Sequence, residues 1–286
     1  MPTSARPTSR RKSPADRTQP PRGARPMVPA TPPAELIDQL RELRLPMFRE
    51  HFQSQAERAA AESLSHTAYL AELAALECQT RRESRIRRMM NQSRLPSSKT
   101  WSNFTWTRLP LQVTRQMESL RDGSFLDRRE NLLLFGKPGS GKSHCLCALG
   151  EQLIQRGRLV LFTTCSLLVQ QLLIAKRDLQ LPRMIKKLSR YEALIIDDLG
   201  YVQQSRDEME VLFTLLAERY ERGSVLLTSN LPFSKWEQIF KDAMTTAAAI
   251  DRLVHHSVIL ELNVPSYRLE NAKKPKPDPP TTSQKT

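Results

Sequence analysis

The stretch that decides the fold is LLLFGKPGSGKSHCLCALG, residues 132–150. Four apolar residues, typical of a buried strand, lead into a glycine-rich turn, and a helical pattern follows. The turn, GKPGSGKS at residues 136–143, matches GxxxxGK[ST] completely and stands in the required place between strand and helix. Glycines there let consecutive backbone N–H groups surround a phosphate, and the helix N-terminus adds partial positive charge. The stretch therefore predicts a nucleotide-binding α/β fold rather than a glycine turn without a ligand.

The turn also assigns roles to particular side chains. Lys142 is expected to reach the β- and γ-phosphates of ATP, and the Ser143 hydroxyl is expected to bind Mg²⁺. The residues predicted to bind the nucleotide are Gly136, Lys137, Pro138, Gly139, Ser140, Gly141, Lys142, Ser143 and His144.

A second motif, LIIDDLG at residues 194–200, ends an apolar strand in two carboxylates. Ligands bind at the carboxyl ends of the strands in parallel sheets, so Asp197 is predicted to hold Mg²⁺. Asp198 stands where a general base that orients water would be. The strand LLTSN ends nearby, and Thr228 or Asn230 could orient the attacking water, although Ser-Asn after a strand is often only a turn.

Strands and helices are predicted to alternate from residue 131 onward, which indicates a parallel sheet flanked by helices. Strands are predicted at residues 131–136, 159–165, within 191–200, at 224–230 and at 258–262. Helices are predicted at residues 143–157, 166–178 and 208–223 and over most of 235–257. We assign residues 121–270 to this ATPase domain.

Residues 34–120 are predicted to form an N-terminal helical domain that binds DNA or a partner, with one helical pattern interrupted at Pro46. Residues 1–33 and 271–286 are rich in polar residues and proline, and we interpret them as a disordered basic arm and a disordered tail. A cluster of arginines near residue 90 is the candidate DNA-binding surface, with a solvated helix face as the alternative. Its members are Arg81, Arg82, Arg85, Arg87, Arg88 and Arg94.

The net charge of +14 over 286 residues favours a polyanionic partner, either nucleic acid or an anionic membrane surface. The sequence has no apolar run long enough to span a membrane and no secretory signal, so a cytoplasmic protein is expected.

The four cysteines form no CxxC pair and are expected to be buried thiols. His255 and His256 show no third ligand in the sequence and are interpreted as structural or polar surface residues.

Two further arginines are candidates: Arg252, in AIDRLVHHS, lies within the last predicted helix, and Arg268, in VPSYR, follows the last predicted strand. Phosphoryl transfer gains from an arginine that meets the developing charge, so one is expected to act in cis and one from a neighbouring subunit. Surface salt bridges are the alternative for both.

These motifs, together with LAERYERGSVLLTSNLPFSKW and AAAIDRLVHHSVILELNVPSYR, resemble the IstB-like ATPases of bacterial insertion sequences. That family belongs to the AAA+ initiator group, as do helicase loaders of the DnaC type. The resemblance implies that Asn230 is a sensor-1 residue, Arg252 an arginine finger and Arg268 a sensor-2 arginine. It also implies ATP-dependent homo-oligomers on double-stranded DNA that stimulate the transposase of the same element. Asp198 stands where many AAA+ proteins have Glu, which is compatible with slow hydrolysis, although Asp-Asp is usual in this subgroup.

Two other functions remain open at this stage. A DnaC-like helicase loader would bind a replicative helicase through its N-terminal helices. A small-molecule kinase with the same glycine-rich turn would need an acceptor pocket, for which the sequence shows no signature.

Overall fold

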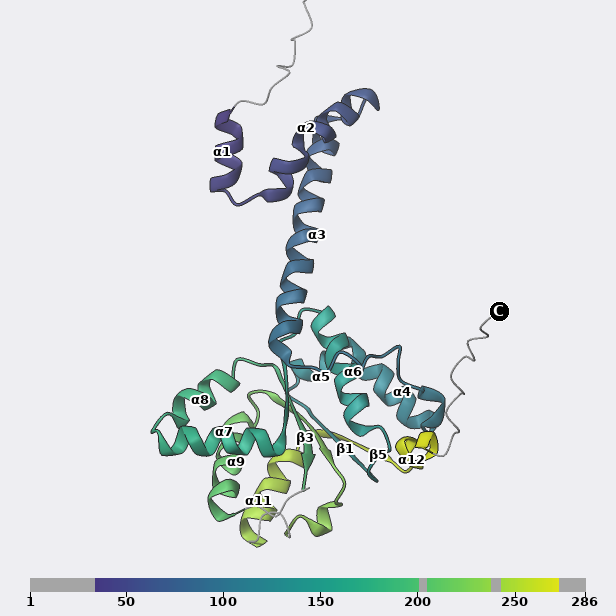
Figure 1. The fold of residues 1–286 in the computed structure, drawn as a ribbon, viewed down its shortest axis with the longest axis vertical. Helices are drawn as coiled ribbons and strands as arrows, with labels where there is room; N and C mark the ends of the chain where they lie inside the picture. The colour runs from purple at the N-terminus through teal and green to yellow at the C-terminus, as the bar shows by residue number, and fades with distance from the viewer. Residues whose placement is uncertain (1–33, 201–204, 238–242, 273–286) are drawn as a thin grey trace, which may run out of the picture. The chain divides into compact units, whose positions relative to one another are not determined.

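The computed structural model describes residues 34–200, 205–237 and 243–272 (Figure 1). These residues form two compact units, one ending at Glu77 and the other beginning at Cys78. The predicted basic arm lies outside the described residues, as does the predicted tail from residue 273 onward. In the described part of the chain, no helix combines the length and the apolar character needed to cross a membrane.

The first unit contains α1 (Ala34–Glu42), α2 (Pro46–Ala61) and the beginning of α3 (His66–Ser93). Pro46 occupies the first turn of α2, where its missing N–H costs nothing, so the predicted interruption of the helix is confirmed. The side chain of Glu77 accepts a 2.9 Å hydrogen bond from the backbone N–H of Met47. The Tyr69 hydroxyl donates to the Phe52 carbonyl at 3.0 Å, which ties α3 to α2.

The second unit is built on five parallel strands in the order β2-β3-β4-β1-β5, which confirms the predicted parallel α/β sheet. The strands are β1 (Asn131–Gly136), β2 (Val160–Thr164), β3 (Ala193–Leu199), β4 (Ser224–Ser229) and β5 (Ser257–Leu262). Alternate side chains of each strand point to opposite faces, so this sheet has two cores. Leu132 and Leu134 belong to one core, and Leu133 and Phe135 belong to the other.

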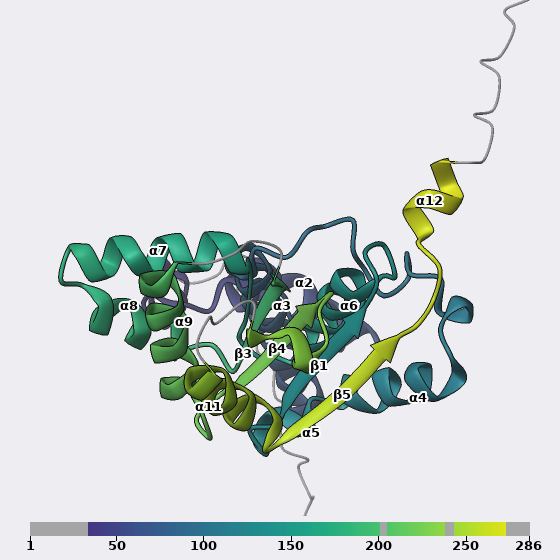
Figure 2. The same cartoon turned by 90° about the horizontal axis from the view of Figure 1, so that it is seen from below.

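The helices divide between the two cores. The Leu132 core takes residues from α3, α4 (Leu111–Ser119), α5 (Ser124–Asp127) and α6 (Lys142–Gln155). The Leu133 core takes residues from α7 (Cys165–Arg177), α8 (Leu181–Leu188), α9 (Arg206–Arg219) and α11 (Ala243–Val254). Figure 2 shows this second group gathered on the left of the strands.

Residues 109–126 pack against the sheet as part of the Leu132 core, through Leu109, Val113, Met117, Leu120 and Phe125. The predicted domain boundary after residue 120 therefore does not coincide with the division between compact units, which falls after Glu77. The short 3-10 turns η1 (Trp106–Arg108) and η2 (Leu120–Asp122) shape this segment. Gly123 adopts φ 79° at its end, where the sequence predicted a turn.

Four details differ from the sequence-based expectations. Helix α8 was not predicted; it is only eight residues long and has a proline in its first turn. Asp197 and Asp198 lie inside β3 rather than after it. The helix predicted over most of residues 235–257 is confirmed by α11, but Lys235 belongs to the 3-10 turn η3 (Phe233–Lys235) and residues 238–242 lie outside the described chain. Residues 271 and 272, which were predicted to belong to the tail, lie in α12 (Tyr267–Ala272).

Candidate nucleotide-binding site

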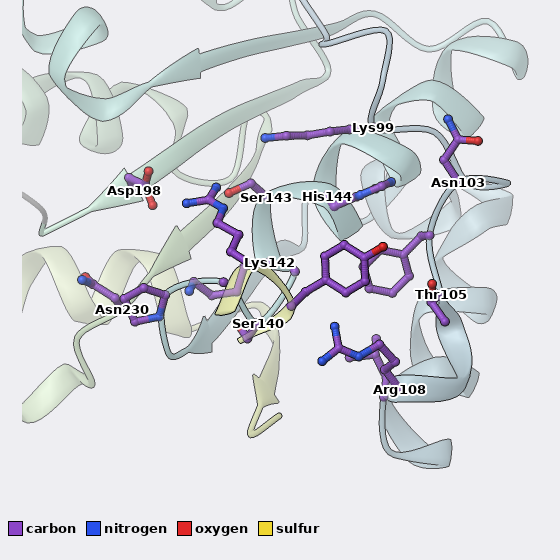
Figure 3. Close-up of a pocket in the computed structure, with 17 residues that line it drawn as sticks. Lys99, Asn103, Thr105, Arg108, Ser140, Lys142, Ser143, His144, Asp198 and Asn230 are labelled. Atoms are coloured by element: carbon purple, nitrogen blue, oxygen red, sulfur yellow. The ribbon is translucent and has the colours of Figure 1, made fainter. Parts of the chain in front are cut away.

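A pocket of about 340 Å³ opens at the carboxyl ends of the central strands (Figure 3). Residues 138–144 of the glycine-rich turn and the start of α6 line it, together with Asp198 and Asn230 from the ends of β3 and β4. The remaining lining comes from residues 99–109 and from Tyr267 and Arg268. Gly136 and Lys137, which were also expected to bind the nucleotide, do not line this pocket.

The glycine-rich turn has the backbone conformation of a phosphate-binding loop. Gly139 and Gly141 adopt φ of 80° and 99°, a region that other residues rarely enter. Gly141 is the N-cap of α6 and no side chain caps the helix, so its first N–H groups remain available to a ligand. Ser140 is 5% exposed, and its hydroxyl has no hydrogen-bond partner within the described part of the chain. These features fit the phosphates of a nucleotide.

Lys142 is buried, and its amine donates to the carbonyl oxygens of Gly136 at 2.7 Å and Lys137 at 3.0 Å. Burial lowers the pKa of Lys142, and the negative charges of Asp198 and Asp197 act in the opposite direction. A desolvated cation held by two neutral carbonyls gains from an anionic partner, so this amine is poised for a phosphate.

Asp197 and Asp198 occupy a β-bulge in β3. The register shifts between Ile196 and Leu199, so Asp197 and Asp198 together lie opposite the single residue Thr228 on β4. Asp198 has φ 61°, a left-handed conformation that turns its side chain toward the pocket. The Thr228 hydroxyl accepts a 2.8 Å hydrogen bond from the Asp198 N–H and donates at 2.7 Å to Asp197 Oδ1.

The two carboxylates therefore differ in environment. Asp197 is 5% exposed and is held by Thr228, whereas Asp198 lines the pocket. Desolvation raises the pKa of Asp198, and the negative charge of Asp197 raises it further. Lys142, Lys99 and Arg268 act in the opposite direction. Asp198 is thus a stronger base than a solvated aspartate.

The other predicted polar residues separate into two groups. Asn230 and Arg268 line the pocket, and Thr228 lies behind the carboxylates rather than in the pocket. Arg252 does not line the pocket of its own chain. Its guanidinium lies over the Phe213 ring, 4.8 Å from the centroid, and donates to the Ala248 carbonyl at 3.0 Å.

Residues 99–108 form one wall of the pocket, and the sequence did not predict that role. The His144 ring nitrogen Nε2 lies 2.9 Å from the Thr100 carbonyl oxygen. Phe104 packs against Gly141, where an added Cβ would come within 2.9 Å of the ring. The sequence did contain a clue to this packing. The polar segment is interrupted by Trp101, Phe104 and Trp106, and exposed linkers rarely carry three aromatic residues.

Arg108 joins this wall to the C-terminal helix. Its guanidinium donates to Glu270 at 2.7 Å and to the Pro265 carbonyl at 3.2 Å, and it lies 4.9 Å from the centre of the Tyr267 ring. The Tyr267 N–H donates to the Gly139 carbonyl at 3.0 Å. The C-terminal helix is therefore attached both to the wall and to the glycine-rich turn.

All six predicted DNA-contacting arginines are exposed; five lie on α3, and Arg94 follows it with φ 58°.

The expectation for the histidines was incomplete. Glu221 brings a carboxylate to His255 and His256, with ligand atoms all within 4.8 Å of one another, and the Tyr220 hydroxyl lies 2.9 Å from His255 Nδ1. All three potential ligands are exposed. One cysteine, Cys78, is exposed rather than buried.

Comparison with solved structures agrees with this architecture. The AMPPCP-bound DnaA of Aquifex aeolicus matches 59% of this chain and 51% of its own, with a TM-score of 0.50 and 16% identity. Domain III of the Thermotoga maritima replication initiation protein DnaA matches 62% of this chain and 72% of its own, with a TM-score of 0.50 and 17% identity. At these identities the likeness shows the AAA+ fold alone.

Curated relatives are closer in sequence. An insertion sequence ATP-binding protein of Sinorhizobium fredii is 42% identical over 85% of this chain and 82% of its own length. The insertion sequence IS21 ATP-binding protein of Pseudomonas aeruginosa is 35% identical over 84% of this chain and 91% of its own length. The family model described as IstB-like ATP binding protein matches residues 38–275. The chain therefore belongs to the IstB-like ATP-binding protein family.

Proposed function

We propose that this protein is an insertion-sequence ATPase that assembles on double-stranded DNA and stimulates the transposase of the same element. The observation that carries the proposal is the pocket, in which Lys142, Ser143, Asp198 and Arg268 converge at the N-terminus of α6. The relatives' names, which describe insertion sequence ATP-binding proteins, support the biological context.

ATP would place its phosphates against the free N–H groups at the start of α6, in the turn that Gly139 and Gly141 form with their positive φ. Lys142 would exchange its loop carbonyls for phosphate oxygens, and Arg268 would add a second positive charge from the C-terminal helix. Ser143 and Asp197 would hold Mg²⁺, which when bound withdraws charge from the phosphate oxygens. Both provide oxygen ligands, as Mg²⁺ prefers.

Asp198 is the proposed base and water-orienting residue of hydrolysis. Its raised pKa increases its affinity for the proton of the attacking water, and its bulge conformation directs it into the pocket. Asn230 lines the same side and would hold the water by its amide. Lys142→Ala should abolish ATP binding in calorimetry, and retained affinity would refute the site.

Arg252 provides the argument for assembly. The backbone carbonyls of Arg252 and Leu253 accept hydrogen bonds from the Asn131 side chain, at the amino end of β1. The pocket lies beyond Gly136 at the other end, about 16 Å away at about 3.3 Å per residue. Arg252 would therefore complete a neighbouring subunit's site. Arg252→Ala should spare ATP binding and remove assembly-dependent hydrolysis; unchanged turnover in an assembled sample would exclude this role.

The arginine cluster of residues 81–94 is the proposed DNA surface. Each phosphate contact lowers the slope of log affinity against log salt by about 0.9. Replacing Arg85 and Arg88 by Gln should weaken duplex binding and make that slope less negative by about 2. A matched control replaces Arg128 and Arg222, which are also exposed but pair with Glu130 and Glu218. An unchanged slope in the Arg85/Arg88 variant would place the DNA elsewhere.

The helicase-loader alternative predicts a different partner from the same ATP site. Purified transposase should raise ATP turnover on duplex DNA if the proposal holds, whereas a replicative helicase should do so for a loader. Turnover raised only by a small-molecule acceptor would indicate a kinase and contradict both.

A further inference from the structure

Lys99 enters the pocket from the segment that follows α3, far in sequence from the glycine-rich turn. It is half-buried and belongs to the pocket lining. In Figure 3 its side chain runs past His144 and Ser143 toward the side of the pocket where Asp198 lies. The lysine therefore points to the carboxylate side of the site and away from Arg108, which lies on the opposite side (Figure 3).

The backbone around Lys99 is fixed on α6. The Lys99 N–H donates to the Pro96 carbonyl at 3.1 Å in a turn. The next residue, Thr100, lies 2.9 Å from His144 Nε2 through its carbonyl oxygen, and the Trp101 N–H donates to Glu151 at 3.3 Å. Because His144 follows Lys142 and Ser143 directly, these contacts set Lys99 beside the two phosphate-binding residues.

Aromatic packing reinforces this position. The rings of Trp101 and Trp106 stack with centroids 4.0 Å apart, and the Arg121 guanidinium lies 4.5 Å from the centre of the Trp101 ring. The Trp106 ring N–H also donates to the Trp101 carbonyl at 3.0 Å. A side chain on such a supported segment is pre-organised, so little ordering opposes its contact with a ligand.

The charge of Lys99 is available to a ligand. Among the residues that the structure describes, no carboxylate lies within 4.0 Å of its amine, and the Phe162 ring is its neighbour with the centroid 6.0 Å away. Arg108, another cation of the pocket, is already paired with Glu270. A half-buried ammonium without a paired anion is costly, and a phosphate oxygen would offset that cost.

We propose that Lys99 is a further phosphate-binding residue of this site and contacts the terminal phosphate of the bound nucleoside triphosphate. The inference rests on the proposed ATPase function, because it assumes that the nucleotide lies against the glycine-rich turn. The terminal phosphate is the expected contact because Lys99 extends toward Asp198, the proposed base for attack on that phosphate. Lys99 would then distinguish ATP from ADP.

The test compares ATP and ADP binding to the full-length protein by calorimetry without DNA. Lys99→Met keeps the apolar stem and removes the charge, and Lys99→Arg keeps the charge. We expect Lys99→Met to weaken ATP binding about tenfold or more, as for a lost hydrogen bond between charged groups, and ADP binding by less than about threefold. Lys99→Arg should retain most of the preference for ATP. Lys186→Met, at an exposed lysine of α8, is the matched control and should change neither affinity.

Two results would overturn the inference while the ATP site stands. Lys99→Met could bind ATP as tightly as the wild type, or it could lose ATP and ADP affinity equally, which would indicate a role in supporting the wall. Failure of the ATPase proposal looks different. In that case the wild type would not bind ATP, or Lys142→Ala would bind it as tightly as the wild type does, and both proposals would then fall.

Discussion

Replacing Thr228 by Val removes one hydroxyl that bonds the carboxylate of Asp197 and the backbone of Asp198. Thr228 is fully buried, and its hydroxyl bonds Asp197 Oδ1 and the backbone N–H of Asp198. The bulge leaves that N–H without a ladder partner on β4, and the hydroxyl substitutes for one. Valine has nearly the same shape, so the substitution tests the hydrogen bonds rather than the packing.

The expected destabilisation follows from the two bonds. A hydrogen bond to a charged group contributes about 1.5–3 kcal/mol and a neutral one about 0.5–1.5 kcal/mol. Water cannot replace them at a fully buried position, so we expect the free energy of unfolding to fall by about 2–4 kcal/mol. Turnover should fall about 10- to 100-fold, because Asp198 is no longer held in its bulge conformation.

Thr228→Ser is the matched control, since it keeps the hydroxyl and loses only a methyl group. It should lose about 1 kcal/mol of stability and most of its turnover should remain. Chemical denaturation and steady-state ATP hydrolysis measure both quantities. A Val variant within about 0.5 kcal/mol of the wild type, or a Ser variant as impaired as the Val variant, would refute the argument.

Three further predictions concern the surrounding structure. Arg219 is 2% exposed, and its guanidinium donates to four backbone carbonyls. Arg219→Lys should therefore lower the free energy of unfolding, measured by chemical denaturation, by about 3 kcal/mol or more, and a loss below about 1 kcal/mol would contradict this. Gly139→Ala would place a Cβ 2.1 Å from Ser266 Oγ at φ 80°, so ATP binding should weaken and stability should fall by about 1–3 kcal/mol; an unchanged melting temperature would contradict it. Burial raises the pKa of Cys147 to about 12, and Cys78 is the one exposed thiol of four. A disulfide reagent at pH 8 should therefore modify Cys78 rapidly and the three buried thiols only on unfolding.

The features that the sequence predicted well are local ones. The glycine-rich turn, the strand before it and the helix after it are encoded within residues 131–157, and each segment favours its own conformation. The order of the motifs along the chain then implied the sheet. What local pattern could not predict was the bulge, because Asp197 and Asp198 appear in sequence as an ordinary end of a strand. Only the neighbouring strand β4 shows why Asp197 and Asp198 both fit opposite the single residue Thr228.

The wall of the pocket depended on contacts between distant segments. Arg108 and Glu270 are 162 residues apart in the chain, and no periodicity relates them. Lys99 likewise precedes the motif by 37 residues and carries no recognisable signature of its own. The three nearby aromatic residues were the available clue. They indicated packing, but the surface on which they pack is defined only once α6 and the sheet are in place.

The position of Arg252 sharpens what the arginine finger assignment requires. Its guanidinium already has the Phe213 ring and the Ala248 carbonyl as neighbours, and its backbone is anchored by Asn131 at the amino end of the sheet. Partial unfolding of α11 would be needed to bring it to its own pocket. A neighbouring copy demands no such change, only an interface that includes α9 and α11. An assembly whose interface excludes these helices would therefore remove Arg252 from any nucleotide site. Locating the interface between subunits thus also tests the proposed role of Arg252 as an arginine finger.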